Sequence, residues 1–133
     1  MLAMADVADI VAADELSRSF VITNPQLPDN PVCFISREFT EQTGYSVAEA
    51  SGRNCRFLQG PETSPAAVDA IRQALEMAEA ITVDIRNYRR DGEPFWNRLR
   101  IRPVIKQGLL LYFIGVQNPI SVDQVRPLGP RYD

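Results

Sequence analysis

Residues 81–118 read ITVDIRNYRRDGEPFWNRLRIRPVIKQGLLLYFIGVQN, and this stretch predicts three consecutive β-strands. Apolar and polar side chains alternate along much of it, which is typical of strands with one buried face. Two turn signals divide it, Arg90-Asp91-Gly92-Glu93 and Lys106-Gln107-Gly108. The expected strands therefore cover about 81–89, 94–105 and 109–118. Strands that are joined by such short turns pair with each other in an antiparallel sheet.

The segment before this stretch predicts two more strands and several helices. SFVIT at 19–23 and VCFI at 32–35 have the composition of strands. Ser36 begins a helix that Gly44 ends, and Ser46 with Glu49 forms a capping box. Ser64-Pro65 begins the clearest helix, to which Val68, Ile71, Leu75 and Ala78 give an apolar stripe. The chain is therefore expected to be an α+β domain with a five-stranded antiparallel sheet.

The two ends of the chain differ from this central region. Residues 1–17 are rich in alanine and acidic residues, with Val7, Ile10, Val11 and Leu16 at helical spacing, and they predict a short amphipathic helix. From Pro119 onward, prolines and a glycine favour a short, poorly ordered tail. We therefore expect a flanking helix at 1–17, one domain at 18–118 and a tail at 119–133.

Composition excludes several classes of function. The 133 residues contain no histidine, which excludes Ser-His-Asp and Cys-His catalysis and histidine-bound zinc or haem. Two cysteines, Cys33 and Cys55, are too few for a disulfide framework or a four-thiolate metal site. The net charge of −3 gives no basic surface for nucleic acid or an anionic membrane. With no signal peptide and no membrane span, a soluble cytoplasmic protein that binds neither nucleic acid nor membrane is expected.

Three amides interrupt the apolar faces of the last strands. Asn87 shares a face with Val83 and Ile85, Asn97 lies in the row of Phe95, Leu99 and Ile101, and Gln117 ends the row of Leu109, Leu111, Phe113 and Gly115. The length of the hairpin loop decides whether Asn87 lies opposite Asn97. A three-residue loop would pair them directly, whereas a two-residue loop would place them on opposite faces of the sheet. Buried amides need partners. These three either satisfy one another or face a ligand, which Gly115 would allow close to the backbone.

The other face of the strand at 94–105 carries Trp96, Arg98, Arg100 and Arg102, and it is expected to be solvated. The segment GRNCRFLQG at 52–60 allows two interpretations as well. Cys55 is either a structural thiol or a reactive one. Arg56 and Arg72 suit a terminal phosphate, because guanidinium binds phosphate in a bidentate manner, but each could equally form a surface ion pair.

These segments together resemble the light-oxygen-voltage (LOV) family of flavin photoreceptors, a branch of the PAS fold. The resemblance rests on GRNCRFLQG, Ile71-Arg72, NYRRDGEPFWN and YFIGVQ, in that order, and extends from Phe20 (FVITNPQLPDNP) to Gln117. It implies a pocket for FMN between the sheet and the helices that cover one of its faces.

The resemblance also implies roles for individual residues. Cys55 would be the photoreactive thiol that forms a reversible adduct with flavin C4a under blue light, and Gln117 would sense the protonation of N5. Asn54 and Gln59 would contact the ribityl chain and ring, and Arg56 and Arg72 the phosphate. Asn87 and Asn97 would bind the pyrimidine edge, and Thr23 and Asn30 would line the rim; Phe113 completes the expected FMN contacts.

The sequence leaves open how this domain would pass on a signal, and it leaves two alternative functions. The chain would act as a sensory, non-catalytic domain that signals through its flanking segments or as a homodimer with an unknown partner. Residues 1–17 either contribute a dimer contact through Val7, Ile10, Val11 and Leu16 or pack on the domain's own sheet. Cys33 either faces the pocket or is a small core residue. The alternative functions are a flavin or thiol redox sensor and a light-independent PAS module that binds another ligand.

Overall fold

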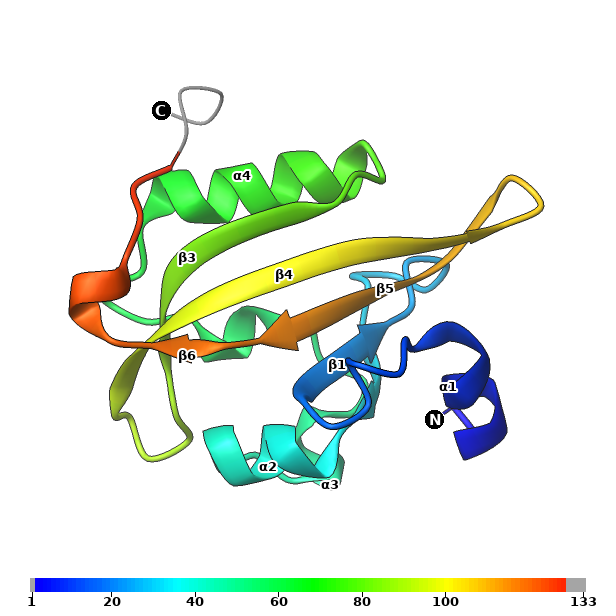
Figure 1. Ribbon diagram of the computed structural model, residues 1–133, viewed down its shortest axis with the longest axis horizontal. Coiled ribbons are helices and arrows are strands. Elements are labelled where there is room, and N and C mark those ends of the chain that lie inside the picture. The colour runs from blue at the N-terminus through cyan, green and yellow to red at the C-terminus, as the bar shows by residue number, and fades with distance from the viewer. Residues whose placement is uncertain (1, 129–133) are drawn as a thin grey trace.

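The computed structural model describes residues 2–128 as a curved antiparallel sheet with helices on both faces (Figure 1). The strands are β1 (Ser19–Thr23), β2 (Val32–Ile35), β3 (Ile81–Tyr88), β4 (Pro94–Lys106), β5 (Leu109–Gln117) and β6 (Pro119–Ile120). The helices are α1 (Met4–Ile10), α2 (Arg37–Thr43), α3 (Val47–Ala50) and α4 (Pro65–Glu76), with 3₁₀ turns η1 (Cys55–Leu58) and η2 (Val122–Gln124).

The strand order is β2-β1-β5-β4-β3, and every pair is antiparallel. This confirms the α+β class and the five predicted strands. The two-residue strand β6 was not predicted; it pairs with β4 through Trp96 and Ile120 and extends the edge that β5 leaves after Gln117. The expectation of a poorly ordered tail is therefore wrong for residues 119–124. Residues 129–133 lie outside the described part of the chain.

Local signals place α2, α3 and α4 as expected, whereas the helix expected over 1–17 covers only Met4–Ile10 and has no side-chain cap. The Ser36 hydroxyl accepts a hydrogen bond from the Phe39 N–H, and Gly44 ends α2 in the left-handed conformation at φ 83°. Ser46 and Glu49 form the predicted capping box of α3. In α4 the most buried side chains are Ala67, Ala70 and Ala74 rather than the predicted stripe. Small residues at these positions let α4 lie close to β3.

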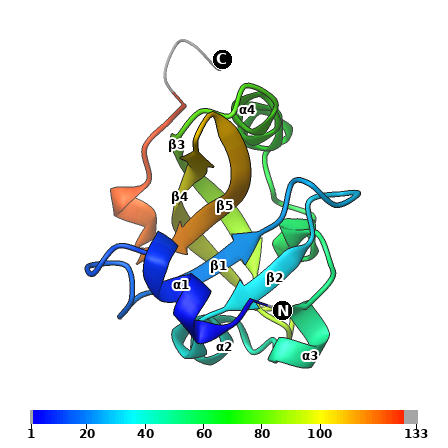
Figure 2. The same cartoon turned by 90° about the vertical axis from the view of Figure 1, so that its right-hand side faces the viewer.

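The face of the sheet opposite α4 is covered by the N-terminal segment (Figure 2). Val7 of α1 and Val11 just after it are 1% and 6% exposed, and they pack in one cluster with Phe20, Ile22, Val104, Ile114 and Val116. Of the two expectations for this segment, Val7 and Val11 therefore follow the second and pack on the domain's own sheet. Cys33 packs against the same cluster, so it is a core residue on the side away from the pocket.

Ion pairs cover the β3–β4 part of this outer face, which sequence analysis expected to be solvated. Arg98 of β4 donates two hydrogen bonds to Asp84 of β3, at 2.8 and 3.0 Å. Arg102 binds the carboxylate of Glu15 at 2.7 and 3.0 Å, which ties the N-terminal segment to the sheet. These hydrogen bonds hold the pKa of Glu15 below its ordinary value. Arg100 is exposed, as expected.

Candidate functional site

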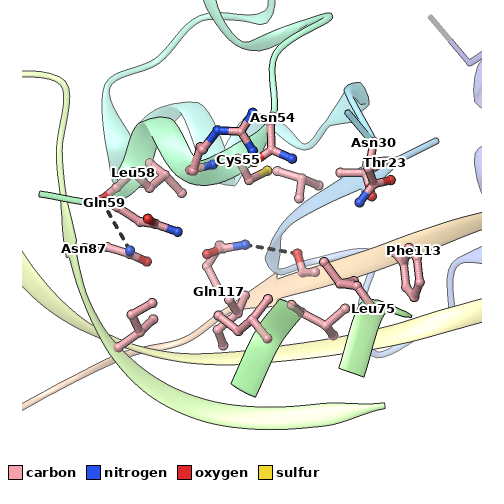
Figure 3. Close-up of a pocket in the computed structure, with 17 residues that line it drawn as sticks. Thr23, Asn30, Asn54, Cys55, Leu58, Gln59, Leu75, Asn87, Phe113 and Gln117 are labelled. Atoms are coloured by element: carbon pink, nitrogen blue, oxygen red, sulfur yellow. Dashed lines mark hydrogen bonds between the residues drawn. The ribbon is translucent and has the colours of Figure 1, made fainter. Parts of the chain in front are cut away.

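A pocket lies between the inner face of the sheet and the segment that runs from η1 to α4 (Figure 3). About 680 Å³ of space there, counting the part that is open to solvent, is free of atoms. Nine of the eleven site residues predicted from sequence line it: Thr23, Asn30, Asn54, Cys55, Arg56, Gln59, Asn87, Phe113 and Gln117. The pocket therefore gathers residues from both ends of the domain.

The remaining pocket wall is mostly apolar, and sequence analysis did not assign its members to the site. Val21, Ile85, Leu99 and Ile101 come from the strands, Leu58 from η1, and Ile71 and Leu75 from α4. Their signal was present, because the strand residues lie on the same faces as Thr23, Asn87 and Asn97. Apolar walls contributed by the sheet on one side and by η1 and α4 on the other suit an aromatic ring system.

Cys55 owes its place to a short local motif. Asn54 precedes η1 as its N-cap: its side-chain oxygen accepts a hydrogen bond from the Arg56 N–H at 3.0 Å, and its Nδ2 donates to the Asp29 carbonyl at 2.8 Å. Cys55, the first residue of η1, is thereby held at the pocket wall that faces Gln117 across the cavity (Figure 3). Burial raises the pKa of the Cys55 thiol to about 12, so the sulfur carries its proton at neutral pH.

The three inward amides are bonded to one another. Asn97 donates through Nδ2 to Asn87 Oδ1 at 2.9 Å and to Gln117 Oε1 at 2.6 Å. Asn87 and Asn97 are not directly opposite, since the register pairs Asn87 with Phe95 and Asn97 with Ile85. They are diagonal neighbours on one face, and Asn97 lies behind the other two rather than in the pocket wall. Asn97 therefore finds its hydrogen-bond partners among the other amides, while Asn87 and Gln117 still face the cavity.

One buried side-chain polar atom of the pocket has no partner in the described structure. Asn30 adopts a left-handed conformation at φ 48°, which asparagine tolerates better than most residues. Its Oδ1 is buried in the pocket and accepts no hydrogen bond. An unsatisfied buried acceptor costs roughly 1–3 kcal/mol, so this atom is suited to accept a hydrogen bond from a ligand.

The two arginines are placed differently. Arg56 lines the pocket and forms an ion pair with Asp29 at the surface. Arg72 does not line it; its guanidinium bonds to Asp69 one turn earlier on α4, at 2.8 Å. This is the surface ion pair that sequence analysis left open for Arg72. Both pairs are exposed, and solvent screening makes such pairs weak, so an anionic ligand group could displace either carboxylate.

Two glycines lie at the site, and one of them allows a close approach that a side chain would block. A Cβ at Gly60 would lie 2.3 Å from the Tyr88 ring, so only glycine allows the end of GRNCRFLQG to pack there. A Cβ at Gly115 would meet Val21 and Leu99 at 3.4 and 3.7 Å, within the pocket lining. Gly115 lies in the pocket lining, where the sequence suggested close approach of a ligand, but these distances are ordinary van der Waals contacts.

Two other kinds of site are not found within residues 2–128. No group of three or more acidic or cysteine side chains is placed to hold a metal ion in that part of the chain. No helix there is long and apolar enough to cross a membrane.

Comparison with known proteins gives one family match and many relatives. Residues 17–121 match the PAS domain family. The chain is 49% identical over 119 residues to "Phototropin-2" of Oryza sativa subsp. japonica, covering 89% of this chain and 13% of that protein. It is 47% identical over 114 residues to a "Blue-light-activated histidine kinase" of Brucella anthropi, covering 84% and 23%. The chain thus spans less than a quarter of either relative.

Solved structures agree with these matches over nearly the whole domain. The structure named "Flavin Analogue Sheds Light on Light-Oxygen-Voltage Domain Mechanism" superposes with a TM-score of 0.84 at 43% identity, covering 91% of this chain and 90% of that one. The dark structure of the blue-light photoreceptor Aureochrome1 LOV gives 0.79 at 40% identity, covering 92% and 86%.

Proposed function

We propose a photosensory function for this chain, which belongs to the PAS domain family and, within it, to the light-oxygen-voltage (LOV) domains. Its relatives include blue-light receptors, which supports the same role here. We infer that residues 17–121 form a non-catalytic sensory domain, because they match the PAS family and superpose on LOV domains. The finer proposals are FMN as chromophore, Cys55 as the reacting thiol and Gln117 as the sensor.

The residues of the pocket fit FMN. The apolar walls from the sheet and α4 suit a flat ring, and Asn87 and Gln117 offer donors and acceptors to its polar edge. The unpartnered Asn30 Oδ1 is an acceptor available to a ligand donor. Arg56 is positioned to bind a phosphate in exchange for Asp29, and Arg72 would join it after leaving Asp69. Thr23, Gln59 and Asn54 complete the proposed contacts.

The observation that carries this proposal is the position of the Cys55 side chain in the pocket wall opposite Gln117. When bound, FMN would supply blue-light absorption and, once excited, an acceptor carbon C4a for the Cys55 sulfur and an acceptor N5 for the thiol proton. Cys55 would hold that proton in the dark, because burial disfavours the thiolate. No activating base is needed for such a step, which agrees with the pKa that burial produces.

Gln117 would detect the change through its side-chain amide. This amide already joins the pocket to Asn97 and to the Gly115 carbonyl, at 2.6 and 3.1 Å. A group that changes from acceptor to donor in front of an amide favours the opposite amide orientation. The output would pass to the flanking segments or to a homodimer contact. Val7 and Val11 are buried against the sheet, so Met4 and Leu16 are the exposed large apolar residues of the N-terminal segment from residue 2 onward.

Substitution of the two cysteines tests the assignment. After loading with FMN, Cys55→Ser should bind and fluoresce but should not bleach under blue light. Cys33→Ser is the matched control, because Cys33 lies on the other side of the sheet, and it should bleach and recover. Bleaching that survives in Cys55→Ser, or is lost only in Cys33→Ser, would remove Cys55 from the proposed role.

A further inference from the structure

Asn118 occupies the break between β5 and β6. It continues the register of β5 along β4, and its carbonyl accepts a hydrogen bond from the Arg98 N–H at 2.7 Å. Its own N–H donates to Asn97 Oδ1 at 2.9 Å, and its side chain donates to the Arg98 carbonyl at 3.0 Å. This residue is not part of the pocket wall, yet it bonds directly to the amide behind it.

The hydrogen bonds of Asn97 leave its orientation no freedom. Both of its Nδ2 hydrogens are used, one by Asn87 and one by Gln117, and its Oδ1 is used by Asn118. An amide carries its donors and its acceptor at opposite ends. The orientations of Gln117 and Asn97 are therefore interlocked with the bond to the Asn118 main chain.

An exchange of the oxygen and nitrogen of Gln117 would place two donors face to face. Asn97 is fully buried, so a lost bond there leaves a buried polar group without a partner. If Asn97 turns with Gln117, it instead presents Nδ2 to the Asn118 N–H, which then has no acceptor. In the first case the Asn97 side chain, which accepts from the Asn118 N–H, loses a hydrogen bond. In the second case the Asn118 N–H itself loses its acceptor.

Beyond Asn118 the contacts divide into two arms. Asn118 Oδ1 accepts a hydrogen bond from Arg18 Nη1 at 2.6 Å, which connects it to the N-terminal segment. The second arm runs through Arg98, whose guanidinium donates to Asp84 and to the Gln124 carbonyl at 2.8 Å.

The second arm holds the C-terminal segment on the outer face. The Arg126 N–H donates to Asp84 Oδ2 at 2.8 Å, beside the bonds from Arg98. Burial alone would raise the pKa of Asp84, but these hydrogen bonds outweigh it and hold that pKa low. The carboxylate therefore stays charged at neutral pH, and the hydrogen bonds that join Asp84 and Arg98 to residues 124–126 persist there.

We propose that Asn118 is a positioning residue that links the Gln117 amide to both flanking segments, through its side chain to Arg18 and through its main chain to Arg98. The inference rests on the proposed function, because light is what would reorient Gln117. The hydrogen bonds from Gln117 through Asn97 to Asn118 are also present in the dark protein without any chromophore. The side-chain arm is the weaker one, since the Arg18–Asn118 bond is exposed.

Hydrogen exchange with and without blue light tests the two arms separately. In the FMN-loaded wild type, light should accelerate exchange of the Asn118 N–H about fivefold, as expected for one lost hydrogen bond, and should accelerate exchange at 12–18 and 121–128. Asn118→Ala should bleach normally and keep the response at 121–128 but lose it at 12–18. Arg18→Ala should do the same, and it serves if Asn118→Ala does not fold. Arg37→Ala, which removes a surface arginine of α2, is the matched control and should change nothing.

A dark measurement separates failure of this inference from failure of the proposed function. Without light or FMN, Gln117→Leu removes one of the two acceptors of Asn97 Nδ2 and loosens the Asn97 amide that holds the Asn118 N–H, so this N–H should again exchange about fivefold faster. An unchanged Asn118 N–H in this variant would overturn the linkage whatever the photochemistry. A wild type that does not bleach would overturn the proposed function alone. Bleaching with a light response at 12–18 that survives in both Asn118→Ala and Arg18→Ala would overturn the role of Asn118.

Discussion

Alkylation of Cys55 in the dark should be slow, and its rate can be worked out from the pKa. Burial raises that pKa from 9.0 to about 12, so near neutral pH the thiolate fraction is about a thousandfold lower than for an ordinary cysteine. A more basic thiolate is intrinsically more nucleophilic, and with a Brønsted coefficient of about 0.45 this returns a factor of about 20. The net expectation is a rate about 50-fold below that of the same cysteine in the unfolded chain.

Mass spectrometry of the Cys55 peptide after timed treatment with iodoacetamide at pH 7.5 measures this rate. The reference is the same chain in denaturant, with correction for the effect of denaturant on a small thiol. A folded-state rate within threefold of the reference would refute the reasoning, because it would mean that the pocket does not suppress the thiolate.

The same pKa makes a prediction for the light reaction. If the thiol is the reacting species, the rate of bleaching in the FMN-loaded protein should be nearly constant between pH 6 and 9, since Cys55 stays protonated throughout. Time-resolved absorption after a blue flash measures it. A rate that rises about tenfold per pH unit would show that the thiolate reacts instead.

Three further predictions concern the sensor, the phosphate site and the N-terminal segment. Gln117→Leu should still form the adduct, with an altered fine structure of the flavin band in absorption spectra; an unchanged spectrum would move the sensor elsewhere. Arg56→Ala with Arg72→Ala should weaken FMN by calorimetry at least tenfold more than riboflavin, and equal losses would contradict a phosphate role. Glu15→Gln should lower the unfolding free energy at pH 7 by roughly 1–3 kcal/mol. Because the folded pKa of Glu15 is depressed, this difference should shrink as the pH falls below about 4.5 and through the folded pKa; a difference in urea denaturation that does not change between pH 7 and the lowest pH at which the protein still folds would argue against the Arg102 pair.

Most of the fold was predictable because its signals are local. Ser36, Gly44 and Ser64-Pro65 place helix ends by capping, which depends on a few neighbouring residues. The five strands follow from alternation and turn residues. β6 was missed because a two-residue strand that begins with Pro119 has no pattern of its own; it exists because β4 is longer than β5 and offers a free edge.

Features that depend on strand register or on a partner surface were harder to predict from the sequence. The Asn87–Asn97 geometry required the hairpin loop, and the bond from the Arg89 N–H to the Glu93 carbonyl selects a register two residues away from direct pairing. Val7 and Val11 form an apolar stripe that fits either the domain's own sheet or a second copy, and the periodicity of a stripe does not identify what it packs on. For Arg72 the neighbouring Asp69 supplied a partner that competes with any phosphate.

The absorption spectrum of the purified protein tests the central claim most directly. It should be recorded after loading with FMN in the dark, immediately after a blue pulse and during dark recovery. The account predicts a structured flavin band that bleaches and returns, because Cys55 would form and release its bond in the pocket. A protein that stays colourless after loading would contradict FMN binding and favour a light-independent PAS module. A flavin band that never bleaches would contradict the Cys55 reaction and favour redox sensing.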